Sequence, residues 1–221
     1  MLLQRAGTGT IPPPDFSPPH WESLAAQWQT APKPAVPTVE FSPSIVTLGI
    51  DDIEEEDNDP AKRYDVAGHI FGWDNESPSR QAEVKAFRID WRPVTNGEFY
   101  EFYTGAGRGK VKFPASWEDH SGDVRVSCTI HASSFRAIPN TLQVRTLHGS
   151  VPIRIAWDWP VLTCYDSLSV YASVRGGRIP TEPELRLFLD KFSCGYEGGA
   201  NVGFRNWHPI PYVYTPREGT A

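Results

Sequence analysis

RPVTNGEFYEFY, from Arg92 to Tyr103, is the stretch that decides the fold of this chain. Thr95, followed three residues later by Glu98, predicts a capping box at the start of a helix. The turns that follow place aromatic side chains at helical spacing, which indicates a short buried helix. These side chains are Phe99, Phe102 and Tyr103. We interpret the stretch as a fold signature, because it carries no nucleophile and no metal ligand.

Two strands are predicted upstream of this stretch. SIVTLG, Ser44–Gly49, alternates well enough for a first strand. VKAFRID, Val84–Asp90, reads as a second strand that Pro93 then breaks. Between them lies an acidic run, DDIEEEDND, Asp51–Asp59. We interpret this run as a solvated loop. The alternative is a calcium site, but the run lacks the glycine-centred ligand spacing of an EF-hand loop.

Two further helices are predicted downstream. Asp166 can cap a helix that runs through Val174, and the glycines at 176–177 supply its stop. Thr181 with Glu184 forms a second capping box. Apolar side chains then recur at helical spacing, which predicts that they lie in the core. They are Leu185, Phe188, Leu189 and Phe192.

Residues 1–43 are rich in Pro, Ser, Thr and Ala, and we interpret them as a linker or an extended arm that packs on the domain surface. Within them, HWESLAAQW, His20–Trp28, could form a short helix. The N-terminus has no apolar core of signal-peptide length. No apolar run approaches the length of a bilayer span, about 20 residues. These features favour a cytoplasmic protein without membrane contact.

The composition narrows the function classes. The 221 residues suffice for one domain with a sizeable core. The net charge of −6 and the lack of a basic stripe argue against a nucleic-acid partner. Cys128, Cys164 and Cys194 are odd in number and widely spaced, which favours reduced thiols. Eight Trp residues with abundant Gly and Pro fit a loop-rich α+β domain better than a helical bundle.

Two motifs have a structural and a functional interpretation. In FGWDNES, Phe71–Ser77, we expect Asp74 and Asn75 to hydrogen-bond a neighbouring loop; catalytic acids are the alternative. In GGRIPTEPELR, Gly176–Arg186, we expect a charge-assisted pair between Arg178 and Glu184 that fixes the helix to the preceding loop. Substrate binding is the alternative for that pair.

NVGFRNWHP, Asn201–Pro209, supplies the best candidate for a binding site. Its last side chains could line a pocket: Arg205, Asn206, Trp207 and His208. An arginine fork bonds a carboxylate bidentately. A tryptophan face attracts a quaternary ammonium group. The alternative is structural, because a histidine beside proline in a loop more often has no ligand.

These motifs together resemble the formylglycine-generating-enzyme-like (sulfatase-modifying factor) domain. RPVTNGEFYEFY is similar to the family's PVTNGEY-type pattern, and GGRIPTEPELR to its GxRLPTEAEWE pattern. DWPVLTCYDSL and NVGFRNWHP resemble the version in fungal ergothioneine biosynthesis proteins, the iron-dependent sulfoxide synthases. The resemblance implies an α+β, C-type-lectin-like fold that is loop-rich and incomplete at the C-terminus. Its structural signature positions would be Trp73, Asp74, Asn75, Thr95, Asn96, Arg178 and Glu184.

The resemblance also names a chemistry. In the complete family member, Fe(II) and dioxygen join a cysteine sulfur to the imidazole carbon of hercynine. This domain would form one wall of the substrate pocket, with Arg205, Asn206 and Trp207 as candidate contacts. The family's iron ligands are histidines of a preceding helical domain, and none of the six His residues here matches that motif. We therefore expect no metal ligand and no catalytic residue in this chain alone, so whether it is an enzyme stays open.

Two segments depart from the family, and two other functions remain open. Residues 44–211 would form a partial domain with an atypical insert at about 125–141, followed by an atypical tail, 212–221. We hypothesise an unspliced intron and a premature end, which transcript sequencing tests, and we expect marginal stability. The alternatives are an inactive lectin-like binding or scaffold fragment, and a formylglycine-generating oxidase. The cysteines do not match the copper-binding pair of such an oxidase.

Overall fold

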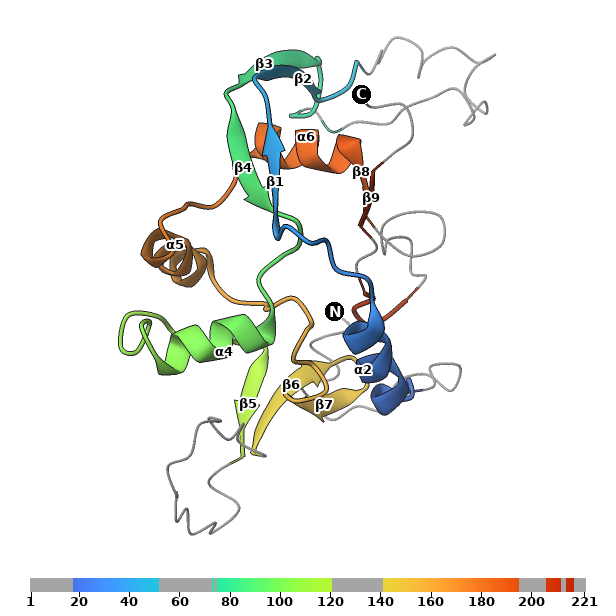
Figure 1. The fold of residues 1–221 in the computed structure, drawn as a ribbon, viewed down its shortest axis with the longest axis vertical. Helices are drawn as coiled ribbons and strands as arrows, with labels where there is room; N and C mark the ends of the chain where they lie inside the picture. Colours follow the sequence, from blue (N-terminus) through green and yellow to red (C-terminus); the bar gives the residue numbers. More distant parts are fainter. Residues whose placement is uncertain are drawn as a thin grey trace. The chain divides into compact units, whose positions relative to one another are not determined.

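The computed structural model describes residues 18–51, 73, 75–120, 141–194, 206–211 and 214–216. They fall into two compact units (Figure 1). The first is drawn from Met1–Ala35, Arg92–Ile179 and Ser193–Thr215, and the second from Val36–Trp91, Pro180–Phe192 and Pro216–Ala221. Helices and small antiparallel sheets occur together, so the predicted α+β class is confirmed at this level, while the lectin-like topology stays a prediction.

In the described residues of the second unit, four strands pair two by two and one helix accompanies them. β1 (Thr38–Phe41) is antiparallel to β4 (Phe87–Asp90), and β2 (Ser44–Leu48) is antiparallel to β3 (Arg80–Val84). The helix α6 (Glu182–Lys191) packs against β2 and β3. The predicted first strand at Ser44–Gly49 is therefore confirmed as β2.

The predicted strand over Val84–Asp90 is wrong in one respect, because it is interrupted. β3 ends at Val84 and β4 begins at Phe87. The register continues without a slip across the gap. Phe41 lies opposite Phe87, and Ser44, three residues after Phe41, lies opposite Val84, three residues before Phe87. Pro43 lies in the matching gap between β1 and β2. Proline has no N–H to donate, so the ladder breaks there.

Helix α6 begins with the predicted capping box between Thr181 and Glu184. The predicted core stripe is only partly correct. Phe188 is buried and meets Phe41 edge-on, with ring centroids 6.3 Å apart. Leu185 and Leu189 are 44% and 43% exposed, whereas the unpredicted Leu187 is buried. The inward face carries Glu184, Leu187 and Phe188, which lie within one turn of each other. Leu185 and Leu189 share the adjoining flank. Phe192 lies just beyond α6, with its ring 5.2 Å from that of Phe188.

The described residues of the first unit form three helices and a three-stranded antiparallel sheet. The helices are α2 (Trp21–Thr30), α4 (Asn96–Thr104) and α5 (Tyr165–Val174). The sheet has the order β5-β6-β7, formed by β5 (Trp117–Asp119), β6 (Leu142–Thr146) and β7 (Gly149–Pro152). β8 (Phe192–Cys194) and β9 (Tyr214–Pro216) form a separate two-stranded sheet.

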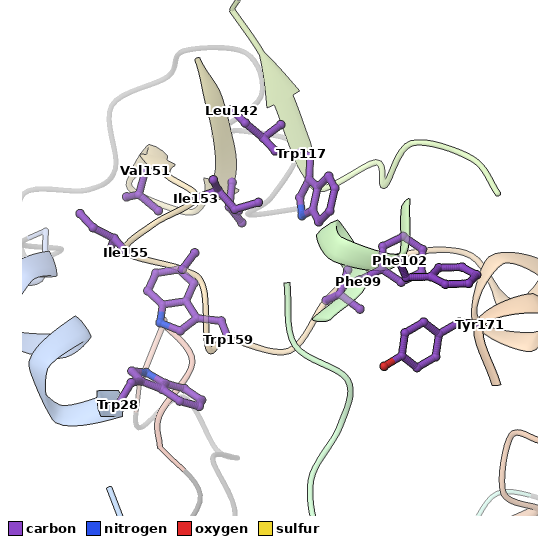
Figure 2. Packing of buried hydrophobic residues seen from close by; sticks show 13 residues of the cluster. Trp28, Phe99, Phe102, Trp117, Leu142, Val151, Ile153, Ile155, Trp159 and Tyr171 are labelled. Atoms are coloured by element: carbon purple, nitrogen blue, oxygen red, sulfur yellow. The ribbon is translucent and has the colours of Figure 1, made fainter. Parts of the chain in front are cut away.

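An aromatic core holds this first unit together (Figure 2). Phe99 of α4 is fully buried, and its ring lies 6.0 Å from those of Trp117 and Tyr171. Phe102 meets Tyr171 edge-on at 5.0 Å. The predicted buried face of α4 is confirmed for Phe99 and Phe102, while Tyr103 is half-buried and packs against the cluster.

The start of α5 differs from the prediction. The N-cap is Cys164, in extended backbone conformation, and Asp166 lies within the first turn. A carboxylate there is still favourable, because the helix N-terminus carries partial positive charge. The end of the helix is as predicted: Gly176 has a φ of +76°, and the Gly177 N–H donates to the carbonyl of Ala172.

Residues 1–43 contribute more than a surface arm to the described structure. The helix expected at His20–Trp28 forms as α2, and Trp28 lies in the aromatic core. Strand β1 also begins within them. Of the insert at 125–141 only Thr141 is described, and of the tail at 212–221 only Tyr214–Pro216. Across the described residues, no helix is long and apolar enough to cross a membrane.

Candidate functional site

The RPVTNGEF motif forms a rigid junction at the start of α4. Thr95 Oγ1 accepts the Glu98 N–H at 3.2 Å, and Glu98 Oε2 accepts the Thr95 N–H at 2.9 Å. The Arg92 guanidinium bonds both carboxylate oxygens of Glu98, at 2.9 and 3.0 Å. Burial acts to raise the pKa of Glu98, but the bonds from Arg92 and Thr95 hold it below its ordinary value. Both the predicted cap and the carboxylate charge are therefore structural.

Asn96 connects three parts of the first unit. Its side chain donates from Nδ2 to the Ala156 carbonyl at 2.9 Å. It also accepts the Trp117 indole N–H at 2.8 Å. Its backbone N–H donates to the Trp159 carbonyl at 2.8 Å. Because Asn96 is buried, each of these bonds satisfies a group that water cannot reach.

Gly97 permits a close approach that no other residue allows. Its N–H donates to the Trp157 carbonyl at 2.8 Å. A Cβ at this position would lie 2.4 Å from the Trp157 indole ring. Each residue of the TNG sequence thus has one structural role. Thr95 caps the helix, Asn96 bridges buried groups, and Gly97 allows the close contact with Trp157.

The residues expected to line a pocket are only partly described. Arg205 lies outside the described residues. Asn206, Trp207 and His208 are described, and all three are half-buried. The His208 ring, through Nδ1, lies 3.0 Å from the Pro209 carbonyl oxygen. Their role in binding remains a prediction.

A second histidine lies near His208, in the turn between β6 and β7. This residue, His148, has its ring centroid 6.2 Å from that of Trp21, edge to face. Burial lowers the pKa of His148, and the charge of neighbouring His208 lowers it further. Trp21 in turn lies 5.6 Å from Trp159. We call these four residues, Trp21, His148, Trp159 and His208, the indole–imidazole cluster.

One group in the indole–imidazole cluster is chemically unusual. The Nε1 of Trp159 is buried, and no residue in the described part of the chain forms a hydrogen bond with it. The Trp159 indole is buried, whereas the rings of Trp21, His148 and His208 are half-buried. Trp28, which Figure 2 shows with Trp159, adds another indole from α2.

Sequence reasoning missed most of this cluster. A usable signal existed for α2, because Trp21 and Trp28 are two helical turns apart and so share a face. His148 had no such signal, since its neighbours are distant in sequence.

The FGWDNES motif makes the expected loop contact through a different residue. Asp74 lies outside the described residues, and Asn75 and Trp73 are exposed. Glu76 donates its N–H to the Trp73 carbonyl and accepts the Ile50 N–H from the neighbouring loop, at 2.8 and 2.9 Å. The Glu76 carboxylate also accepts the Trp73 N–H at 3.0 Å, so backbone bonds and one side chain together hold this turn.

Arg178 and Glu184 fall in different compact units, and the predicted pair between them stays a prediction. Arg178 donates to the Ile179 carbonyl at 3.1 Å. Glu184 is buried and accepts the Thr181 N–H at 2.8 Å and its hydroxyl at 3.0 Å. The capping role explains the carboxylate without a substrate.

The described residues do not suit a metal ion. Among them no group of three or more His, Cys, Asp or Glu side chains lies close enough to hold one. His69 and His131 fall outside that part of the chain, as does Cys128. Cys164 is exposed, and the hydrogen bond between its thiol and the Ser167 hydroxyl, at 3.2 Å, lowers its pKa.

The chain is similar to proteins of ergothioneine biosynthesis. It is 35% identical to Ergothioneine biosynthesis protein 1 of Schizosaccharomyces pombe over 147 residues, which cover 63% of this chain and 17% of that protein. The protein of the same name from Neurospora crassa is 37% identical over 153 residues, covering 64% and 16%. Hercynine oxygenase of Mycobacterium tuberculosis is 33% identical over 121 residues, covering 54% and 27%.

These relatives are much longer than the matched segments, so the chain spans only about a sixth of the length of the two fungal proteins. The Sulfatase-modifying factor enzyme 1-like domain matches residues 54–204, which is more than half of the chain. That match includes both the RPVTNGEF junction and the capped helix α6. The chain therefore belongs to the sulfatase-modifying factor enzyme 1-like domain family.

Proposed function

We propose that this chain acts as the sulfatase-modifying-factor-like domain of an ergothioneine-type sulfoxide synthase. In that reaction, oxygen drives formation of a carbon–sulfur bond between hercynine and cysteine. The observation that carries the proposal is the likeness to two fungal ergothioneine biosynthesis proteins over most of this chain. The hercynine oxygenase likeness supports the same substrate.

The domain would contribute binding surface to that reaction. Hercynine carries a trimethylammonium group, a carboxylate and an imidazole ring. The half-buried Trp207 and the half-buried Trp21 of the indole–imidazole cluster would offer aromatic faces for the cation. Arg205 and Asn206 would bond the carboxylate. The rigid junction at Arg92–Glu98 would keep the surrounding elements in place.

The iron of the complete family member has no ligand set in the described residues. Iron that activates dioxygen is held by histidine and carboxylate side chains. The chain's own contribution is restricted to binding and orienting the organic substrate.

Tryptophan fluorescence with hercynine as titrant tests this contribution. Binding should quench the fluorescence, and histidine should bind more weakly because it lacks the quaternary ammonium group. Trp207→Ala should weaken hercynine binding about two- to fivefold, the range of one cation–π contact. Trp73→Ala, at an exposed indole of the other unit, is the matched control. Equal losses in both variants, or equal affinity for histidine, would contradict the proposed site.

Oxygen consumption with hercynine and cysteine, measured together with iron content, tests whether this chain only binds the substrate or also carries out the oxidation. We expect no turnover from the purified chain. Iron at one atom per chain, with turnover, would mean that ligands exist beyond the described residues and would overturn the restriction to binding.

The second candidate is a catalytically inactive binding or scaffold module. The wide spacing of Cys128, Cys164 and Cys194, which does not match a copper-binding cysteine pair, favours it over a formylglycine-generating oxidase. It predicts that neither hercynine nor histidine quenches the fluorescence, which separates it from the first proposal.

A further inference from the structure

Two segments of the first unit that are distant in sequence lie against each other. The Ser116 hydroxyl donates to the Leu162 carbonyl at 2.9 Å. The Lys112 N–H donates to the Ser167 hydroxyl at 3.2 Å. The loop that follows α4 therefore runs along the entry to α5.

Large apolar side chains are exposed on both segments. Phe113 is 41% exposed, Leu162 63% and Tyr165 71%. A single exposed apolar side chain is ordinary in a folded protein. Here three lie on two segments that hydrogen bonds hold together, and exposed apolar side chains that gather in this way mark interaction sites.

The same segments carry a local positive charge. Arg108, Lys110 and Lys112 are all exposed. No acidic residue lies between Glu101 and Glu118 in the sequence. Asp166 is the one acid in the adjoining run Leu162–Ser167. The charge of these segments is therefore opposite in sign to the net charge of the whole chain, which is −6.

We propose that this surface binds an acidic peptide segment of a partner protein that also carries aromatic or aliphatic side chains. We call it the basic apolar surface: Arg108, Lys110, Lys112, Phe113, Leu162 and Tyr165. Carboxylates of the partner complement its cations, and the apolar side chains of the partner cover Phe113, Leu162 and Tyr165. Such charge complementarity steers association and fixes the register of binding.

An anionic lipid surface fits less well. Recognition of acidic headgroups typically uses clusters of four to eight Lys or Arg residues. The basic apolar surface has three, and Asp166 lies on the adjoining run. A discrete peptide needs fewer cations, because its own apolar side chains supply part of the contact.

Fluorescence anisotropy on the full chain tests this proposal. The probe is a fluorescein-labelled peptide of eight to ten residues in which Glu alternates with Phe and Leu; a peptide with Lys for Glu is the ligand control. We expect the acidic peptide to bind and the lysine peptide not to bind. Binding should weaken as salt rises from 0.1 to 1 M, where the Debye length falls from about 10 to about 3 Å.

Charge reversal separates this surface from the rest of the chain. Lys110→Glu with Lys112→Glu should weaken peptide binding about tenfold, since two attractive contacts become repulsive. The matched control is Lys85→Glu with Arg88→Glu, which reverses two exposed cations of the other unit. Leu162→Ser should also weaken binding, whereas Ile45→Ser, at an equally exposed residue, should not.

Three results would overturn the proposal. The acidic peptide does not bind at low salt, both double variants weaken binding equally, or vesicles containing phosphatidylserine bind more tightly than the peptide. Near-ultraviolet circular dichroism of each variant checks that the aromatic core is intact, so that a loss of binding reports on the surface.

Discussion

At the residue scale, Asn96 is a signature position whose structural role comes from long-range hydrogen bonds. Its side chain joins Ala156 and Trp117, which are 60 and 21 residues away. Sequence reasoning recognised Asn96 as part of a motif but could not assign these bonds, because both partners are distant in the chain. The short-range cap between Thr95 and Glu98, in contrast, was predicted from spacing alone.

Replacement of Asn96 should destabilise the first unit strongly. Asn96→Ala leaves the Trp117 indole N–H and the Ala156 carbonyl buried without these partners, and each such loss costs about 1–3 kcal/mol. We expect a decrease of about 3 kcal/mol in the free energy of unfolding, measured in urea. Asn75→Ala, at an exposed asparagine, should change it by less than about 0.5 kcal/mol. Equal effects of the two variants would show that the bonds of Asn96 are dispensable.

Gly97 gives a second residue-scale prediction. Gly97→Ala would place a methyl group 2.4 Å from the Trp157 ring, so the indole or the helix must shift. Overpacking of this kind costs about 1–3 kcal/mol. Gly177→Ala is the control, since its nearest neighbour would be the Ala172 carbonyl at 3.7 Å. Thermal unfolding should separate the two variants; a Gly97→Ala protein as stable as the parent would contradict the close packing.

At the element scale, helices α4 and α6 begin at their predicted capping boxes. The burial of their faces was harder to predict. Leu185 and Leu189 have the right spacing for a core stripe but are exposed, whereas α6 buries Leu187 together with the predicted Phe188. Periodicity identifies an amphipathic helix, but it does not decide which of two neighbouring stripes of side chains faces the core. That depends on the rotation of the helix about its axis, which the neighbouring strands determine.

The capping carboxylate of α4 makes the stability of the helix depend on pH. The pKa of Glu98 is lowered from the model-compound value of 4.5, so the folded state binds its proton less readily than the unfolded state. Its contribution is therefore fully present above about pH 4.5 and is lost as pH falls through the lower folded pKa. We expect Glu98→Gln to be less stable by about 1 kcal/mol at pH 7. The difference should shrink as the pH falls below about 4.5.

Urea unfolding at several pH values measures this difference. Glu101→Gln, on the exposed side of the same helix, provides the control, and its effect should be small at every pH. If the deficit of Glu98→Gln persisted unchanged at pH 3, the ionised carboxylate would not be its source.

At the scale of the whole molecule, the family motifs predicted more about this chain than the local patterns of helix and strand did. The resemblance placed the chain in its family from a few short segments, which the match over residues 54–204 bears out. It did not predict that the described residues separate into two compact units. Short-range patterns cannot supply that division, because it depends on which strands pair and which aromatic rings meet across long stretches of chain.

The division into units predicts that the two cores respond separately to mutation. Phe99→Ala opens the core of the first unit, and Phe188→Ala that of the second; losses of this type cost about 3–5 kcal/mol. Stability within a protein varies between cooperative segments, which amide hydrogen exchange resolves. Phe99→Ala should accelerate exchange in β6 and β7 while sparing β1–β4. Phe188→Ala should do the reverse. Faster exchange across both units in either variant would show one cooperative core, because a shared core transmits the loss to every strand that packs on it.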